Sequence, residues 1–322
     1  MKMKHQRQQI LLAVILGIIL PSLMLRLGSL PAQNPQAQNS QTQPTQMAAQ
    51  WHILVLIDGQ IVQMEMDKYL VGVVLAEMPA SFEPEALKAQ AVVARTYALR
   101  RCKECDRHKE GAVCTDHTCC QAYISISDYL ESRGDPSDVE KITQAVLGTS
   151  GEVLTYAGAL ADATYFSCSG GRTEDAAAVW GSDIPYLQAV DSPGEEGAAV
   201  YTDTVYFTAD EFQSALGQTL SGSPKSWLGT MTRSDGGGVA TMMIGGKSYS
   251  GVQLRSLLGL NSTAFTMEVK DGNIVVTTKG KGHRVGMSQY GADAMAVTGS
   301  TYEQILQHYY QGTVIDKMDR LG

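Results

Sequence analysis

Beyond the N-terminal 30 residues, the hydrophobic positions of this chain gather into short runs, and one dense run covers residues 69–76. Its sequence, YLVGVVLA, is apolar at almost every position, which is typical of a helix that is buried on all sides. The run ends at Glu77, directly before a Met-Pro pair at which a helix has to stop. An ionisable side chain is therefore expected at the end of a buried helix.

A second helix is predicted to begin at Glu83-Pro84, because proline is favoured in the first turn and apolar residues follow at helical spacing. These apolar residues are Leu87, Ala91, Ala94 and Ala98. Lys88 and Arg95 lie two helical turns apart and are expected to share one face. The two helices would then place the carboxyl group of Glu77 beside a basic surface formed by Lys88 and Arg95.

The remaining pattern alternates apolar runs with Gly-containing turns, which indicates mixed strands and helices. Two strands are predicted around the Asp58-Gly59 turn, with Asp67 as the N-cap of the first helix. A short strand is expected over residues 120–126, and a hairpin around Asp271-Gly272. The predicted fold class is α+β, a mixed β/α body with two helices around Glu77, plus an N-terminal transmembrane helix.

The chain divides into an N-terminal anchor, a linker and a folded body. Residues 1–30 predict a cytoplasmic tip and a single transmembrane pass, because basic residues precede an apolar segment of bilayer-spanning length. A cleaved signal peptide is the alternative, and both interpretations export the body. Residues 31–50, rich in Pro, Gln, Asn, Ser and Thr, predict a flexible linker. Residues 51–322 form the body, with about 200–260 as an inserted or packing subdomain.

The charge of the chain narrows the possible functions. The formal net charge is −8 at pH 7, and the acidic residues are scattered along the sequence. A protein that binds nucleic acid needs a concentrated basic surface. No nucleic-acid partner is therefore expected.

Several long motifs carry a resemblance to a known family. The sequence YLVGVVLAEMP, followed by EALKAQAVVARTYAL, closely resembles the signature of the stage II sporulation protein D and amidase-enhancer family. The motifs ATYFSCSGGRTED at 163–175, VWGSDIPYLQAV at 179–190 and GHRVGMSQYGA at 282–292 follow in the family's order. The resemblance covers roughly residues 52–318.

The resemblance implies a function, a location and partners. The sporulation members are membrane-anchored lytic transglycosylases that cleave peptidoglycan glycan strands during engulfment. It implies a membrane scaffold and a peptide-removing amidase as partners, and peptide-stripped strands as the substrate. The other branch of the family implies an alternative, a non-catalytic wall-binding activator of an N-acetylmuramoyl-L-alanine amidase.

Glu77 is the candidate catalytic residue. Its apolar neighbours would desolvate the carboxyl group and raise its pKa, as a general acid at neutral pH requires. The resemblance places the family's catalytic glutamate at this position. Hydrolytic glycosidases generally use two carboxylates. A lytic transglycosylase needs one, because the 6-hydroxyl of N-acetylmuramic acid attacks its own C1 in place of water.

Substrate-binding candidates come from the second helix and from the later motifs. Lys88 and Arg95 could contact lactyl carboxylates, or form a solvated helix face. Tyr186 could stack on a sugar ring, or be a buried aromatic residue. The polar residues of the other two motifs are donors and acceptors for glycan groups: Ser167, Ser169, Arg172, Thr173, His283, Ser288, Gln289 and Tyr290. Arg284 stands where the family pattern has Gly.

Residues 102–120 contain five of the six cysteines and two histidines. Disulfides are the usual state outside the cytoplasm, whereas dense Cys and His also suit tetrahedral zinc. Some family members look zinc-bound, and the resemblance implies His108, Cys114, Cys119 and Cys120 as ligands of a structural zinc ion. Other possible ligands are Cys102, Cys105 and His117. Cys168 is expected to be a buried thiol.

Overall fold

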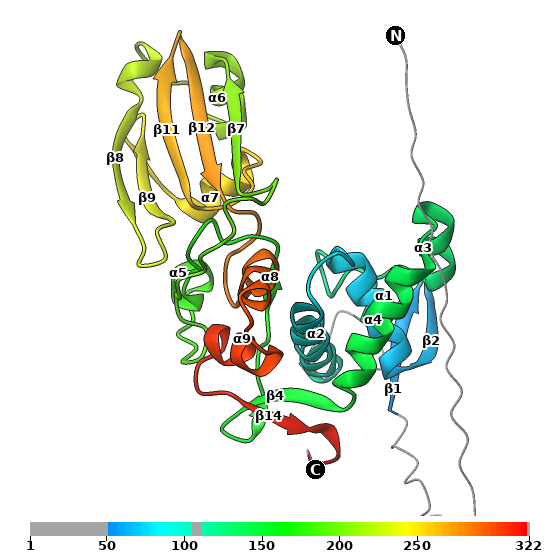
Figure 1. Cartoon of the computed structure of the whole chain (residues 1–322). Helices are drawn as coiled ribbons and strands as arrows, with labels where there is room; N and C mark the ends of the chain where they lie inside the picture. Colours follow the sequence, from blue (N-terminus) through cyan, green and yellow to red (C-terminus); the bar gives the residue numbers. More distant parts are fainter. Residues whose placement is uncertain (1–50, 105–107, 109–110, 321–322) are drawn as a thin grey trace, which may run out of the picture. The chain divides into compact units, whose positions relative to one another are not determined.

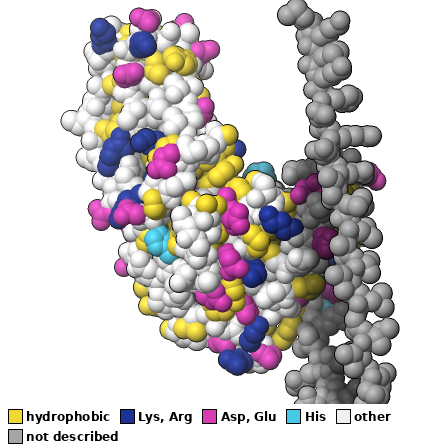
Figure 2. Space-filling view, viewed as in Figure 1, with side chains coloured by type: hydrophobic (Ala, Val, Ile, Leu, Met, Phe, Trp, Pro, Cys, Tyr) yellow, Lys and Arg dark blue, Asp and Glu magenta, His cyan; other side chains and the backbone are white. Residues whose placement is uncertain are grey.

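The computed structural model describes residues 51–104, 108 and 111–320 (Figure 1). The predicted transmembrane anchor and linker lie outside the described residues. No described helix is long and apolar enough to span a membrane. On the face shown in Figure 2, Lys and Arg side chains are interspersed with Asp and Glu. The fold class is α+β.

A small sheet opens the described part of the chain. Strands β1 (His52–Ile57) and β2 (Gln60–Glu65) pair in antiparallel register around the Asp58-Gly59 turn. Asp58 and Gly59 have φ values of 49° and 77°, the left-handed conformation that this two-residue turn requires. Strand β3 (Val113–Cys114) joins the other edge of β1 in parallel. The predicted hairpin is confirmed.

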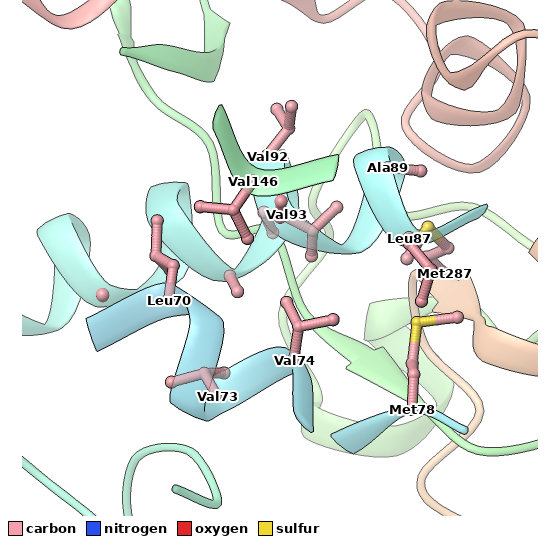
Figure 3. Close-up of a cluster of buried hydrophobic side chains, with 14 of the residues drawn as sticks. Leu70, Val73, Val74, Met78, Leu87, Ala89, Val92, Val93, Val146 and Met287 are labelled. Carbon is pink, nitrogen blue, oxygen red and sulfur yellow. The ribbon is translucent and has the colours of Figure 1, made fainter. Parts of the chain in front are cut away.

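The two predicted helices follow as α1 (Met66–Glu77) and α2 (Pro84–Glu104). Most of α1 is buried, and Figure 3 shows its apolar side chains packed against those of α2. The prediction that Asp67 caps α1 is wrong, because Glu65 occupies that position without a side-chain cap. The carboxylate of Asp67 instead accepts hydrogen bonds from Arg95 and Ser150.

Helices α3 (Ile126–Arg133) and α4 (Pro136–Gly148) pack on the same core, and the side chain of Asp135, the N-cap of α4, accepts the Ser137 N–H. The strand expected over 120–126 is absent from the described residues there. The backbone N–H of Ile124 donates to the Gly72 carbonyl of α1, and the N–H of Ala122 donates to Glu77. This segment therefore bonds to a helix rather than to a strand.

Outside residues 202–279, the second half of the body adds short sheets and three described helices. The elements are β4 (Glu152–Tyr156), β5 (Ala159–Leu160), β6 (Tyr165–Phe166), α5 (Ala176–Trp180), β13 (Met287–Ser288), α8 (Gln289–Val297), α9 (Tyr302–Tyr309), β14 (Val314–Lys317) and a 3-10 turn (Met318–Arg320). One sheet has the order β14-β4-β5, and a parallel pair joins β6 to β13.

Residues 202–279, here called the accessory region, have a hydrophobic core of their own that includes Phe212, Leu254 and Phe265. Its elements are β7 (Thr202–Phe207), α6 (Ala209–Leu216), a 3-10 turn (Pro224–Ser226), β8 (Leu228–Arg233), β9 (Val239–Ile244), β10 (Lys247–Ser250), α7 (Gly251–Leu257), β11 (Phe265–Lys270) and β12 (Asn273–Lys279). The hairpin of β11 and β12 belongs to this region, because β12 pairs with β7. The region therefore extends past residue 260.

The close approach of Gly72 to the 121–124 segment gives a test of this packing. A Cβ at Gly72 would lie 2.4 Å from the Tyr123 ring and 2.6 Å from the Ile124 carbonyl oxygen. We expect Gly72→Ala to lower the free energy of unfolding by about 1–3 kcal/mol, as overpacking does. Gly148→Ala is the control, because its Cβ would meet only Lys88 at an ordinary 3.7 Å. Equal stability of the two variants in urea denaturation would contradict this packing.

Candidate active site

Glu77 lies at the C-terminal end of α1, half-buried, on the wall of a cavity of about 770 Å³. The cavity is lined by residues from the 117–120 segment, from the 164–167 and 281–283 segments, and from the accessory region. Among the described lining residues, Glu77 is the only carboxylate. The acid predicted at the end of a buried helix therefore opens into a space large enough for a ligand.

The surroundings of Glu77 favour its protonated form. Burial raises the pKa of Glu77 above its ordinary value of 4.5. The hydrogen bond from the Ala122 backbone lowers the pKa, and the nearby polar side chains of Gln289 and Tyr165 act in the same direction, which offsets part of that rise. The Ala122 N–H donates to Glu77 Oε1 at 3.0 Å, which fixes the carboxyl group. A raised pKa brings a carboxyl group closer to the pH at which it can act as a general acid.

Tyr165 and Gln121 form a polar network beside Glu77. The Tyr165 hydroxyl donates to Gln121 Oε1 at 2.9 Å, and Gln121 Nε2 donates to the Tyr69 hydroxyl at 3.2 Å. Burial raises the pKa of Tyr165 well above its usual range, so its hydroxyl keeps its proton. Sequence reasoning did not identify this network. Tyr165 nevertheless lies within the motif ATYFSCSGGRTED, two residues before the candidate Ser167.

Three further predicted residues line the same cavity: Ser167, His283 and Gln289. Gln289 is 5% exposed and lies close enough to Glu77 to lower the pKa of that carboxyl. Its Nε2 atom nevertheless has no hydrogen-bond partner of ordinary geometry within the described chain. This atom has almost no surface that solvent can reach, so it lies behind the cavity surface beside Glu77.

His283 lines the cavity with a neutral imidazole ring. Burial, together with the charge of Arg255, lowers its pKa to about 4. Its Nδ1 accepts the Val285 N–H at 3.2 Å, and its ring lies 5.5 Å from the Phe166 ring and 5.4 Å from the Trp180 ring. An imidazole with this pKa does not supply a positive charge at neutral pH.

Lys88 and Arg95 lie on one face of α2, but the prediction that they form a basic surface beside Glu77 is wrong. Arg95 is fully buried and donates to Asp67 and to the carbonyl of Thr149. Lys88 pairs with Glu85 at 2.6 Å. This face packs toward the end of α4, and neither residue lines the cavity.

Ser169 and Ser288 are fully buried and bind a carboxylate of the protein itself. The Ser169 hydroxyl donates to Glu195 Oε2 at 2.8 Å, and the Ser288 hydroxyl donates to Glu195 Oε1 at 2.5 Å. Glu195 also accepts the N–H groups of Ser169 and Gly170. These serines shape the loops behind the cavity, so the prediction that they contact a ligand directly does not fit their positions.

The remaining candidates also lie outside the lining. Thr173 is buried and exchanges hydrogen bonds with the Val190 backbone. Arg172 pairs with Asp191 and bonds the Asp235 carbonyl, and the hydroxyl of Tyr186 accepts the Asp162 N–H at 2.8 Å. Tyr290 packs edge-on against Phe82, with ring centroids 5.0 Å apart.

Arg284 has a structural role at the position where the family pattern has Gly. Its φ of 67° is a backbone conformation that glycine adopts without strain. The buried guanidinium pairs with Glu174 at 3.1 Å and donates to the carbonyls of Ser169, Arg172 and Gly236. Arg284 therefore links the Ser169 loop to the accessory region.

The structure brings the four predicted metal ligands together. The ligand atoms of His108, Cys114, Cys119 and Cys120 all lie within 4.8 Å of one another, and His108 Nε2 is 3.3 Å from Cys119 Sγ. The group therefore has the donor set and proximity for one metal ion. Cys119 and Cys120 also line the cavity, and Ala122, which bonds Glu77, follows two residues later.

Fold and site together define an α+β protein that presents one half-buried carboxyl group in a polar cavity, beside a His/Cys₃ cluster. The family model for "Stage II sporulation protein" matches residues 58–156. Stage II sporulation protein D of Bacillus subtilis (strain 168) is 44% identical over 259 residues, covering 79% of this chain and 75% of that protein. The Bacillus amyloliquefaciens protein of the same name is 43% identical over the same shares.

The chain therefore belongs to the stage II sporulation protein D family. A second named branch is also similar. The amidase enhancer of Bacillus subtilis (strain 168) is 31% identical over 303 residues, covering 76% of this chain and 40% of that protein.

The raised pKa of Glu77 has a consequence for stability. Ionisation of Glu77 opposes folding, so this cost is absent below pH 4.5 and grows as the pH rises through the folded-state pKa. Glutamine stays neutral and keeps an oxygen for the Ala122 N–H. We expect Glu77→Gln to match the parent in unfolding free energy at low pH and to exceed it at neutral and alkaline pH.

Chemical denaturation across a pH series measures this difference. Glu131→Gln, at an exposed position on α3, is the control and should show no such divergence. A parent protein that is more stable than Glu77→Gln at high pH would contradict the assigned environment.

Proposed function

We propose that this protein is a peptidoglycan lytic transglycosylase. It cleaves the bond between N-acetylmuramic acid and N-acetylglucosamine and leaves 1,6-anhydro ends, on peptide-stripped strands during sporulation engulfment. The single carboxyl group of the cavity is the observation that carries this proposal. Glu77 protonates the glycosidic oxygen of the leaving sugar and then accepts the proton of the 6-hydroxyl as that oxygen attacks C1.

The absence of a second carboxylate among the described lining residues supports transglycosylation over hydrolysis. Hydrolytic glycosidases generally place a second carboxylate about 5–10 Å from the acid. Glu174 is paired with Arg284, and Asp175 accepts the Ala189 N–H. Glu83 is exposed and likewise lies outside the described lining. Internal attack by the 6-hydroxyl needs no group to activate water.

The donors around Glu77 suit a glycan. Gln289 and Ser167 line a cavity with polar and aromatic walls, as sugar hydroxyl and N-acetyl groups require. Trp180 and Phe166 supply apolar surface for a sugar ring.

The alternative is a wall-binding activator of an amidase, which the name of the amidase-enhancer relative favours. A binder of this kind gains nothing from a half-buried carboxyl group with a raised pKa. Glu77 therefore favours the enzyme.

The biological setting forms part of the same proposal. An N-terminal pass anchors the body on the outer side of the cell membrane. A membrane scaffold and a peptide-removing amidase act with it, and the amidase supplies the stripped strands. Family membership supports this setting.

We propose zinc as the ion of the His/Cys₃ group, held by His108, Cys114, Cys119 and Cys120. Four protein ligands leave no open position for substrate, so the ion is structural. It would fix the segment that carries Ala122, whose N–H holds Glu77.

The product separates the proposed reaction from hydrolysis. Digestion of peptide-free glycan in ¹⁸O-labelled water should give muramic ends one water lighter than hydrolysed ends, without label. Glu77→Gln should abolish cleavage while glycan binding persists, and Glu131→Gln should cleave normally. Labelled, reducing ends would overturn the transglycosylase assignment, and a fully active Glu77→Gln would remove Glu77 from the acid role.

Metal analysis tests the proposed zinc site. We expect about one zinc ion per chain in the parent and in Cys102→Ala, whose thiol lies outside the group, and loss of metal in Cys119→Ala. A chelator should lower the melting temperature of the parent. Metal-free parent protein with all thiols paired in disulfides would contradict this assignment.

A further inference from the structure

The cavity beside Glu77 carries an excess of positive charge. Among its described lining residues, Arg101, Arg255 and Lys281 are cationic, and Glu77 is the only carboxylate. The whole chain, by contrast, has a net charge of −8. On the face in Figure 2 the two signs are interspersed. A basic cavity in an acidic protein points to an anionic ligand.

Two of these cations lack a carboxylate partner within the described chain. Arg255 donates from Nε to the Leu260 carbonyl at 3.3 Å, and no described carboxylate pairs with its guanidinium. Lys281 is exposed and likewise makes no ion pair with a described residue. Arg101 differs, because its guanidinium lies over the Tyr97 ring, 4.8 Å from the centroid.

Backbone contacts fix both free cations at the cavity. Lys281 exchanges two backbone hydrogen bonds with Cys168, at 2.7 and 3.1 Å, and the next N–H, of Gly282, donates to the Asn261 carbonyl at 2.9 Å. Arg255 comes from the last turn of α7, and the Leu260 carbonyl orients its guanidinium. Two segments, one of them in the accessory region, therefore present positive charge to the same space as Glu77.

We propose that Arg255 and Lys281 form a carboxylate-binding subsite that recognises the free lactyl carboxylate of N-acetylmuramic acid. The inference rests on the proposed function and assigns the specificity of the same cavity. Removal of the stem peptide converts a neutral amide at the lactyl group into a carboxylate. Charge at that group therefore distinguishes stripped from peptide-bearing strands. Guanidinium and ammonium groups form charge-assisted hydrogen bonds with carboxylates.

A comparison of two substrates tests this subsite. One is peptide-free glycan, and the other is the same glycan with its carboxylates capped as neutral methylamides. In the parent, kcat/KM should be about tenfold higher or more for the charged glycan, and higher salt should reduce the ratio. Arg255→Gln and Lys281→Gln should each lower the ratio through KM, and the double variant should bring it close to one.

Control variants distinguish a specific loss of carboxylate recognition from a general loss of folded protein. Lys279→Gln removes an exposed lysine two residues before Lys281 that lies outside the cavity lining, and it should keep the parent ratio. Arg255→Lys and Lys281→Arg keep the charge and should retain most of the preference. An equal loss on both glycans in the Gln variants, or a parent without preference, would overturn the proposed subsite.

Binding separates this inference from the proposed reaction. Equilibrium binding of both glycans to Glu77→Gln needs no cleavage. A carboxylate preference that the Arg255 and Lys281 substitutions remove would support the subsite even if the parent cleaves nothing, in which case only the transglycosylase assignment falls. Cleavage without any carboxylate preference in binding or turnover would keep the enzyme and reject the subsite.

Discussion

The surroundings of Glu77 depend on one buried cation. Arg95 of α2 donates to Asp67 at 3.0 Å and to the carbonyls of Thr149 and Glu152 at 2.8 and 3.0 Å. These bonds join α2 to the start of α1, the end of α4 and the start of β4. A buried charge that loses its partner costs about 3–5 kcal/mol, so this contact specifies one arrangement of the helices. Glu77 lies at the far end of the helix that Arg95 holds.

The local pattern predicted the elements that present Glu77. An apolar run stopped by Met-Pro defines α1, and an Asp-Gly turn defines the hairpin before it. The four Cys and His residues inferred from the resemblance also meet in space. These features follow from short-range chemistry or from motifs of adjacent residues, in which sequence spacing limits the possible geometry.

Contacts between distant segments could not be predicted in this way. The polar motif residues Ser169 and Ser288 bind Glu195, and nothing in the sequence pairs them. The 120–126 run has the alternation of a strand, yet its N–H groups bond to α1 because Gly72 leaves room for Tyr123. Arg255 reaches the cavity from a region without family motifs. Residue type alone does not tell which side of a loop faces a ligand.

The cations that stabilise the fold have carboxylate partners, whereas two of the cations that line the cavity have none within the described chain. Arg95 and Arg284 are buried, and each pairs with a carboxylate. The hydrogen bonds of Arg284 join the Ser169 loop to the accessory region. Arg255 and Lys281 lack such partners among the described residues. A ligand carboxylate can form charge-assisted hydrogen bonds with both groups. Arg255 and Lys281 therefore indicate the charge of the ligand, which the sequence motifs alone do not.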